Sequence, residues 1–278
     1  MKLTVLMDNN TLIDRYFIAE PGVSYLIEEG ETKILFDAGY SDAFIVNARK
    51  MAVSLLDLDY IVLSHGHLDH TWGLVPLVRL YTEALIEGLT VKRPTIIAHP
   101  DVFLPRSVDD IPEIGTLLSE QFISHVFDTV FTRVPYHLTD TCVFLGEIER
   151  TNDFESHMPI GTITKGDRTE PDLIVDDSAL AVTTEAGLVI VTGCSHAGIC
   201  NIANSAMKIT GDSSIRDIIG GFHLLDPPQK QLSGTIDYLT ERAPRTVHAC
   251  HCTDLRSKIA LARTLPLEEV GVGMILEY

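Results

Sequence analysis

Apolar residues along the chain fall into two patterns: short continuous runs bounded by turn residues, and longer stretches with apolar positions three and four residues apart. The short runs predict strands, and several are apolar throughout, as in strands buried on both faces. They cover residues 24–27, 33–36, 60–63, 94–99, 173–175, 179–182 and 188–191. The helical spacing predicts helices over 41–53, 73–86, 112–121, 198–208, 231–242 and 254–265.

Strand, loop and helix repeat in both halves of the chain, which favours two mixed sheets packed face to face with helices outside. We therefore predict an α+β fold, an αββα sandwich, as a single domain over residues 1–278. Residues 101–170 are less regular, and the segment is long enough to form a lid-like insertion over an active site.

Three histidines and an aspartate lie within one loop, directly after the strand predicted at 60–63. His65, His67, Asp69 and His70 therefore sit at a strand end, where side chains from different segments converge. Four polar side chains on one loop are costly to bury unless a partner accepts their lone pairs. Because imidazole nitrogens and carboxylate oxygens are ligands for zinc and similar divalent ions, the loop predicts a metal site.

These four residues match in full the H-x-H-x-D-H motif of the metallo-β-lactamase superfamily, which the chain resembles. The step from strand 33–36 into Asp37-Ala38-Gly39 is also usual there. Within the superfamily, the chain resembles the branch described as dihydropterin ribofuranosyl-aminobenzene phosphate synthase-like. The matching segments are 7–10, 99–101, 146–150, 176–180, 192–198, 220–224 and 251–253. The resemblance implies a metallo-β-lactamase sandwich and two divalent metal ions.

One loop cannot supply every ligand of two metals, because each metal needs at least three protein ligands. Two later apolar strands lead to Cys194 and His196 and to His251. By resemblance, His251 fills the C-terminal histidine position of the superfamily. The superfamily places a bridging aspartate where this chain has Cys194, and the expected upstream histidine is absent. His196 can replace that histidine, and either Cys194 or Asp177 then lies near the metals.

Further polar residues are candidates for catalysis and substrate contact. Asp69 is expected to orient the attacking hydroxide as well as to bind metal. His223, at another strand end, is expected to contact substrate or transfer a proton. The predicted substrate contacts are His99, Arg106 and Arg150, with Lys165 as a further phosphate contact. The remaining histidines are expected to be structural or solvated: His125, His137, His157 and His248.

The formal net charge is −18, from 39 acidic and 21 basic residues, and this balance disfavours nucleic acid as a partner. No apolar run approaches the ~20 residues of a membrane span, and the N-terminus has too few apolar residues for a signal peptide. Five cysteines, an odd number, indicate a reducing compartment. We expect a cytoplasmic protein that acts on a small molecule, and we leave homo-oligomerisation open.

The leading hypothesis is a metal-dependent hydrolase that uses a metal-bound hydroxide on a small phosphorylated or ester-type substrate. Zinc is the first expectation for the two ions, with manganese or iron as alternatives. The branch resemblance implies an alternative, a synthase-type activity in pterin or methanopterin-like biosynthesis. A third alternative is a non-catalytic metal-binding or ligand-sensing module. Di-iron oxygen chemistry is disfavoured, because the oxygen-reducing relatives carry Glu where this chain has His67.

Overall fold

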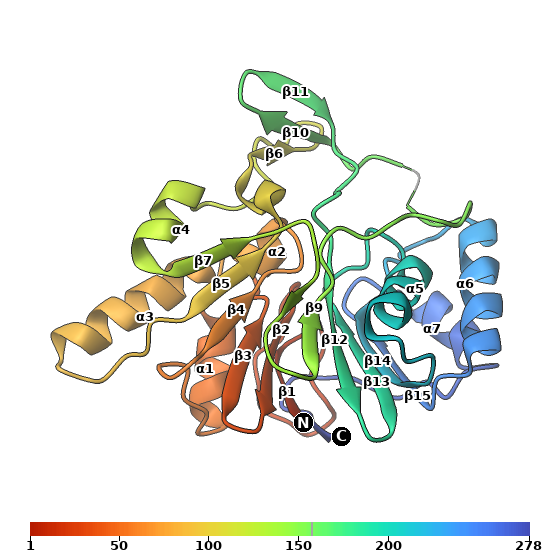
Figure 1. Ribbon diagram of the computed structural model, residues 1–278, viewed down its shortest axis with the longest axis horizontal. Coiled ribbons are helices and arrows are strands. Elements are labelled where there is room, and N and C mark those ends of the chain that lie inside the picture. Colours follow the sequence, from red (N-terminus) through yellow and green to blue (C-terminus); the bar gives the residue numbers. More distant parts are fainter. Residues whose placement is uncertain (157) are drawn as a thin grey trace.

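The computed structural model describes residues 1–156 and 158–278, and two large β-sheets packed face to face form its centre (Figure 1). The first sheet contains, in spatial order, β16 (Ile275–Glu277), β1 (Lys2–Met7), β2 (Ser24–Glu29), β3 (Thr32–Phe36), β4 (Tyr60–Val62), β5 (Thr95–Ala98) and β7 (Asp128–Phe131). The second contains β15 (Thr246–Cys250), β14 (Ile215–Gly221), β13 (Gly187–Thr192), β12 (Ala179–Thr184), β9 (Cys142–Phe144) and β8 (Tyr136–His137).

Helices cover the outer face of each sheet. Those on the first sheet are α1 (Ala43–Lys50), α3 (Leu74–Ile86) and α4 (Glu120–Val126), and those on the second are α5 (Ile199–Thr210), α6 (Gln229–Arg242) and α7 (Leu255–Leu261). The short helices α2 (Leu68–Thr71) and η1 (Pro100–Phe103) lie in loops. Among the described residues, no helix is long and apolar enough to cross a membrane.

Alternate residues of one strand enter different cores. Ile34 and Phe36 of β3 face the second sheet, whereas Leu35 between them packs under the outer helices. In β13, Val189 faces the first sheet and Ile190 packs under the helices of its own side. Because both faces of these strands are buried, their sequences are apolar throughout rather than alternating. The predicted αββα sandwich is therefore confirmed.

Two predicted elements are wrong. The helix expected at 112–121 begins only at Glu120, where the Ser119 side chain accepts the N–H of Phe122 as an N-cap. The stretch before it is irregular because its backbone is hydrogen-bonded to another segment rather than within a helix: Ile114 donates its N–H to the Arg106 carbonyl at 2.9 Å. The strand expected at 173–175 is a loop.

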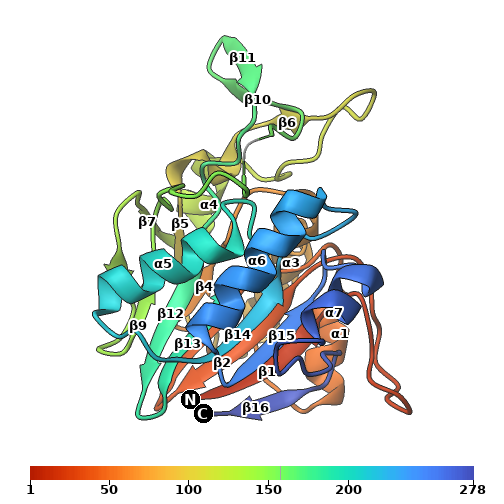
Figure 2. The same cartoon turned by 90° about the vertical axis from the view of Figure 1, so that its right-hand side faces the viewer.

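The segment expected as a lid-like insertion, 101–170, divides between the body and a separate part. Its middle returns to the sandwich, because β7 pairs with β5 and β9 pairs with β12. The remainder forms a small third sheet from β11 (Arg168–Pro171), β10 (Thr162–Lys165) and β6 (Arg106–Ser107). Figure 2 shows this sheet above the sandwich, at the end opposite the two termini.

The strands that lead to the candidate ligands all end at one edge of the sandwich. β3 and β4 are parallel, and β1 runs in the same direction because it is antiparallel to β2, as β3 is. In the other sheet, β13, β14 and β15 are parallel to one another. The loops after parallel strands meet at one edge, and this edge lies beneath the third sheet.

A buried arginine joins the base of the third sheet to the histidine loop. Arg106 is 2% exposed, and its guanidinium pairs with Asp172 and Asp176, each at 2.7 Å. Asp176 also accepts the N–H of Gly66 at 2.8 Å. A Cβ on Gly66 would collide with that guanidinium, which explains a glycine between two histidines. Arg106 is thus an internal cation rather than the substrate contact predicted from sequence.

Replacing Arg106 by methionine should lower the free energy of unfolding by ~3–5 kcal/mol, because two carboxylates would stay buried without their cation. Urea unfolding followed by circular dichroism measures this loss. The matched control is Arg168→Met on β11, an exposed position where the change should stay within ~0.5 kcal/mol. Equal stabilities of the two variants would contradict the assigned role of Arg106.

Candidate metal centre

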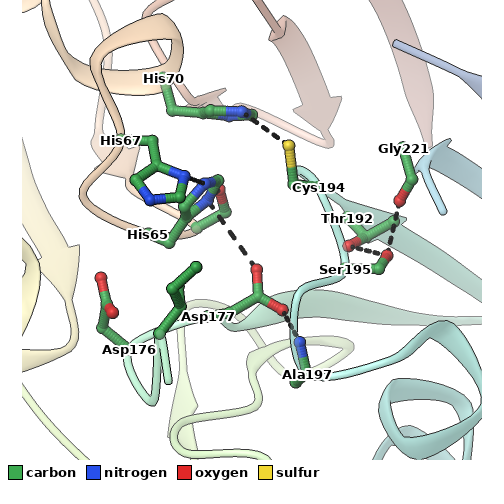
Figure 3. Close-up of polar contacts among 12 residues, drawn as sticks. His65, His67, His70, Asp176, Asp177, Thr192, Cys194, Ser195, Ala197 and Gly221 are labelled. Atoms are coloured by element: carbon green, nitrogen blue, oxygen red, sulfur yellow. Dashed lines mark hydrogen bonds and ion pairs between the residues drawn. The ribbon is translucent and has the colours of Figure 1, made fainter. Parts of the chain in front are cut away.

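Three imidazoles from the two halves of the chain meet at the shared edge of the sheets. Figure 3 shows two of them, His65 and His67. His65 and His67 follow β4, and His196 follows β13. Their ring centroids lie 4.7–4.8 Å apart, and all three side chains are at least nine-tenths buried. In the described structure neither ring nitrogen of His196 has a hydrogen-bond partner, nor has Nε2 of His67. Buried unpaired nitrogens in a cluster of imidazoles are expected where a cation accepts their lone pairs.

A second group of ligands lies beside the first. Asp69 Oδ2 is 3.4 Å from His251 Nε2 and 3.8 Å from His70 Nε2. His251 comes from the end of β15 and takes a left-handed backbone conformation, with φ of 50°. The motif loop and the last strand of the second sheet therefore supply this group together.

Cys194 stands between the two groups. Its sulfur is 3.3 Å from His70 Nε2 and 3.0 Å from His251 Nε2 (Figure 3 shows the former). Ligand atoms of Cys194, His65 and His196 also lie within 4.8 Å of one another. One sulfur is thus within reach of both sets of donors, as a shared ligand requires.

Asp177, the other candidate left open by the sequence, plays a different part. Its Oδ2 accepts the N–H of Ala197 at 2.8 Å, and its Oδ1 lies 3.8 Å from His65 Nδ1, the nitrogen on the far side of that ring from His67. Burial raises the pKa of Asp177 to about 7. The carboxyl group therefore supports the loop that carries His196, and the geometry favours Cys194 as the ligand.

The protonation states of the three imidazoles in the first group suit metal binding. Burial, with repulsion from the neighbouring imidazoles, holds the pKa of His65 and His196 well below the ordinary value. Burial and the Arg106 charge lower the pKa of His67 to about 4. These rings are neutral at physiological pH, which is the state that coordinates a metal. Nitrogen, sulfur and carboxylate donors in this number fit two borderline-soft divalent ions such as zinc.

Hydrogen bonds from neighbouring side chains fix the orientation of the ligand rings. His70 Nδ1 lies 2.6 Å from Asp37 Oδ2, which also accepts the Ser64 hydroxyl at 2.7 Å. Burial lowers the pKa of His70, but the carboxylates of Asp69 and Asp37 outweigh burial and raise it to about 9. An Nδ1–H donated to Asp37 leaves Nε2 facing Cys194, the arrangement in which a carboxylate orients a metal-binding histidine.

The loop after β1 fixes the orientation of the His251 ring. Asn9 Oδ1 lies 2.8 Å from His251 Nδ1, and the buried Asp8 carboxylate accepts the His251 backbone N–H at 3.1 Å. Sequence reasoning noticed segment 7–10 as a branch match but assigned it no role. Its contacts with His251 span more than 240 positions, so no local spacing reveals them.

His223 lies next to the metal-ligand candidates but outside both groups. Its ring centroid is 4.3 Å from that of His196, and its Nδ1 has no hydrogen-bond partner in the described structure. Cys252 accepts the His223 backbone N–H at 3.2 Å, and Gln231 donates to the His223 carbonyl. Burial lowers the pKa of His223, but the hydrogen bond and the negative charge of the Cys252 thiolate outweigh burial and raise it. Two cavities border the His196 and His223 rings: one is also lined by Asp69, Cys194 and His251, and the other is lined largely by apolar side chains.

The other predicted substrate contacts line neither of these cavities. His99 is buried and faces Glu147 at 3.3 Å, and Arg150 donates to the carbonyls of Leu173 and Ile174. Lys165 pairs with Asp101 and Glu170. These predictions are corrected, because each group already has partners in the protein. His248, expected to be structural, pairs with Asp217 of the neighbouring strand β14. His157 lies outside the described residues.

An αββα sandwich with an H-x-H-x-D-H loop at the shared edge of its sheets defines a class of metal-binding proteins. The chain belongs to the metallo-beta-lactamase superfamily, whose family model matches residues 18–153. This confirms the resemblance found in the sequence.

Individual relatives cover the whole chain. It is 31% identical to 7,8-dihydropterin-6-methyl-4-(beta-D-ribofuranosyl)-aminobenzene-5'-phosphate synthase of Methanocaldococcus jannaschii, over 100% of this chain and 97% of the relative. A solved structure of Tm1679, a metal-dependent hydrolase of the beta-lactamase superfamily, matches with a TM-score of 0.84 and 25% identity, covering 100% of this chain and 99% of the other. The metallo-beta-lactamase fold protein YhfI from Bacillus subtilis shares the fold, with a TM-score of 0.58 and 15% identity over 99% of each chain.

If Cys194 is a metal ligand, the cobalt-substituted protein should show a thiolate-to-cobalt charge-transfer band in the near ultraviolet. Cys194→Ser should lose this band and bind less metal, because the hydroxyl is a poor substitute for a thiolate. Absorption spectra and metal analysis measure the two effects. Cys142→Ala, a buried cysteine on β9, is the control and should keep the band. A Cys194→Ser protein with reduced stability but unchanged band and metal content would show that Cys194 only packs.

Asn9→Ala should weaken metal binding by ~10–100-fold, the usual effect of removing a group that orients a ligand. Competition with a chromophoric chelator measures the affinity. Gln121→Ala is the control, because Gln121 is an exposed amide on α4 and has no contact with His251, Asp8 or Asn9 in the described structure. Equal affinities of the two variants would refute the orienting role of Asn9.

Proposed function

We propose that the protein is a metal-dependent hydrolase that cleaves an ester or phosphoester bond of a small molecule. The observation that carries this proposal is a single sulfur, Cys194, within reach of both sets of candidate ligands, at the floor of a cavity that admits a substrate. The superfamily supports a metal-dependent hydrolase as the broad class.

The candidate ligands divide into His65, His67 and His196 for one ion and Asp69, His70 and His251 for the other, with Cys194 shared. Divalent ions held there would supply Lewis acidity and a nucleophile formed from water at neutral pH. No protein nucleophile is then needed. The positive charge of the bound ions, rather than a lysine or arginine, would attract the polar group of the substrate that is attacked.

Two side chains would handle the attacking water and the substrate. Asp69 borders the cavity, and its side chain is 23% exposed, so its carboxylate can accept a hydrogen bond from the water and fix its direction. His223 borders the cavity beside His196, and its unpartnered Nδ1 is available to the substrate or the leaving group. Its backbone is anchored on both sides by Cys252 and Gln231, which keeps the ring in place.

A second candidate is a synthase-type reaction on a pterin precursor and a ribosyl phosphate. It is favoured by the 31% identity, over the whole chain, to a relative named as a synthase. In this reaction the centre would stabilise negative charge on the reacting group without attack by water. Incubation with a pterin donor and a ribosyl aminobenzene phosphate acceptor distinguishes the two, because only a synthase forms a coupled product.

Zinc-loaded protein should hydrolyse at least one member of a panel of p-nitrophenyl esters, phosphomonoesters, phosphodiesters, thioesters and lactones. His65→Ala and Asp69→Ala should each lower kcat/KM by at least ~100-fold and lower the metal content, because each removes a ligand. His125→Ala on α4, remote from the centre, is the control for a lost histidine. A fully loaded protein that turns over no member of the panel would sink the hydrolase proposal, and unchanged metal content in both variants would refute the ligand assignment.

A further inference from the structure

A chamber of about 390 Å³ opens beside the metal centre, with the His196 and His223 rings at its floor. Its walls are largely apolar and are formed by Phe154, Ile160, Ile174, Pro227 and Pro228. The volume suits a small organic molecule, and binding sites for such molecules are typically apolar with a few polar groups at one end. We call this space the apolar chamber.

Large apolar side chains are also exposed around its mouth. Met158 is 82% exposed, Leu225 71% and Leu173 44%. Single exposed apolar residues are common, but a group of them at the mouth of one cavity marks a surface that is covered when a ligand binds. They come from the segments before β10, after β11 and after β14, so folding brings them together.

The wall of the chamber is held rigidly against the metal-binding loop. Glu155 is 1% exposed and accepts the N–H groups of Cys200 and Asn201 in the first turn of α5, the helix that follows His196. Phe154 packs on Gly234 of α6, where a Cβ would come within 2.8 Å of its ring. The chamber is therefore preformed rather than assembled from loose loops, which limits the entropy lost on binding.

Apart from the imidazoles at its floor, the described lining of the chamber has one basic side chain, Lys230, and this side chain is exposed. Its two charged side chains, Asp153 and Lys230, pair with each other at 2.7 Å. The arginine beside the chamber, Arg150, donates instead to the carbonyls of Leu173 and Ile174. A phosphate between the apolar walls of the chamber would lose water and find no opposite charge on those walls.

We propose that the apolar chamber binds an uncharged, apolar part of the substrate, such as an aromatic ring or a branched alkyl group. Resting on the proposed function, this arrangement places the bond to be cleaved at the chamber floor, and any phosphate at the metal centre or outside in solvent. The substrate class is thus an ester or phosphoester of an apolar alcohol or acid, rather than a small sugar phosphate.

Binding of the neutral aromatic probe 1-naphthol tests the chamber without relying on catalysis. Calorimetric titration of the protein as purified should show binding that an excess of inorganic phosphate does not displace. Leu225→Asp should raise Kd about tenfold or more, the size expected for loss of a leucine contact. Leu85→Asp is the matched control, because Leu85 is 60% exposed on α3, on the outer face of the other sheet, and the change should leave Kd unchanged. No binding by the wild type, displacement by phosphate, or equal Kd in both variants would overturn the proposal.

Hydrolysis assays separate this inference from the proposed function. With zinc-loaded protein, the ratio of kcat/KM for 1-naphthyl acetate to that for methyl acetate should fall about tenfold in Leu225→Asp and stay unchanged in Leu85→Asp. Naphthol binding that depends on Leu225, without hydrolysis of any ester, would support the chamber and refute the hydrolase. Hydrolysis with a ratio that Leu225→Asp leaves unchanged would refute the chamber alone.

Discussion

The contact of the Cys194 sulfur with imidazoles from both halves of the chain is the constraint on which the rest of the site depends. His70 lies in α2, after β4 of the first sheet, and His251 follows β15 of the second sheet. Both reach the same sulfur within 3.3 Å. Such a contact requires the carboxyl ends of both sets of parallel strands to face each other across the core. The apolar packing between the sheets therefore fixes the positions of the metal-ligand candidates relative to one another.

Strained backbone at the strand ends makes this convergence possible. Asp37, Ser195, His223 and His251 all take positive φ, between 49° and 60°, which non-glycine residues rarely adopt. Each turn is anchored by a hydrogen bond from another segment: the Ser195 hydroxyl donates to the Gly221 carbonyl at 2.6 Å, and Asp8 accepts the N–H of His251. Strain of this kind is retained where it orients functional side chains. Here it turns the backbone at each strand end sharply toward the metal-ligand candidates.

Local patterns explain why the sequence could predict the fold and part of the site. Strands buried on both faces are apolar throughout, and the ligand loop lies within six positions, so both could be recognised without knowing any distant contact. Charged residues were misjudged for the opposite reason. Arg106 resembles a free cation in the sequence, because Asp172 and Asp176, which neutralise it, are more than sixty positions away. Asn9 was missed for the same reason, because its partner His251 is 242 positions away in the sequence.

Charge distribution relates the metal centre to the apolar chamber. The chain carries a formal net charge of −18, which attracts cations to a site built from imidazoles, a carboxylate and a sulfur. The same field repels polyanions, and the cations close to the site are already paired with protein groups. A substrate that gains its affinity from apolar contact in the chamber avoids this repulsion. The positive charge of bound metals is then felt mainly by the group that reacts, where it stabilises the charge that develops during cleavage.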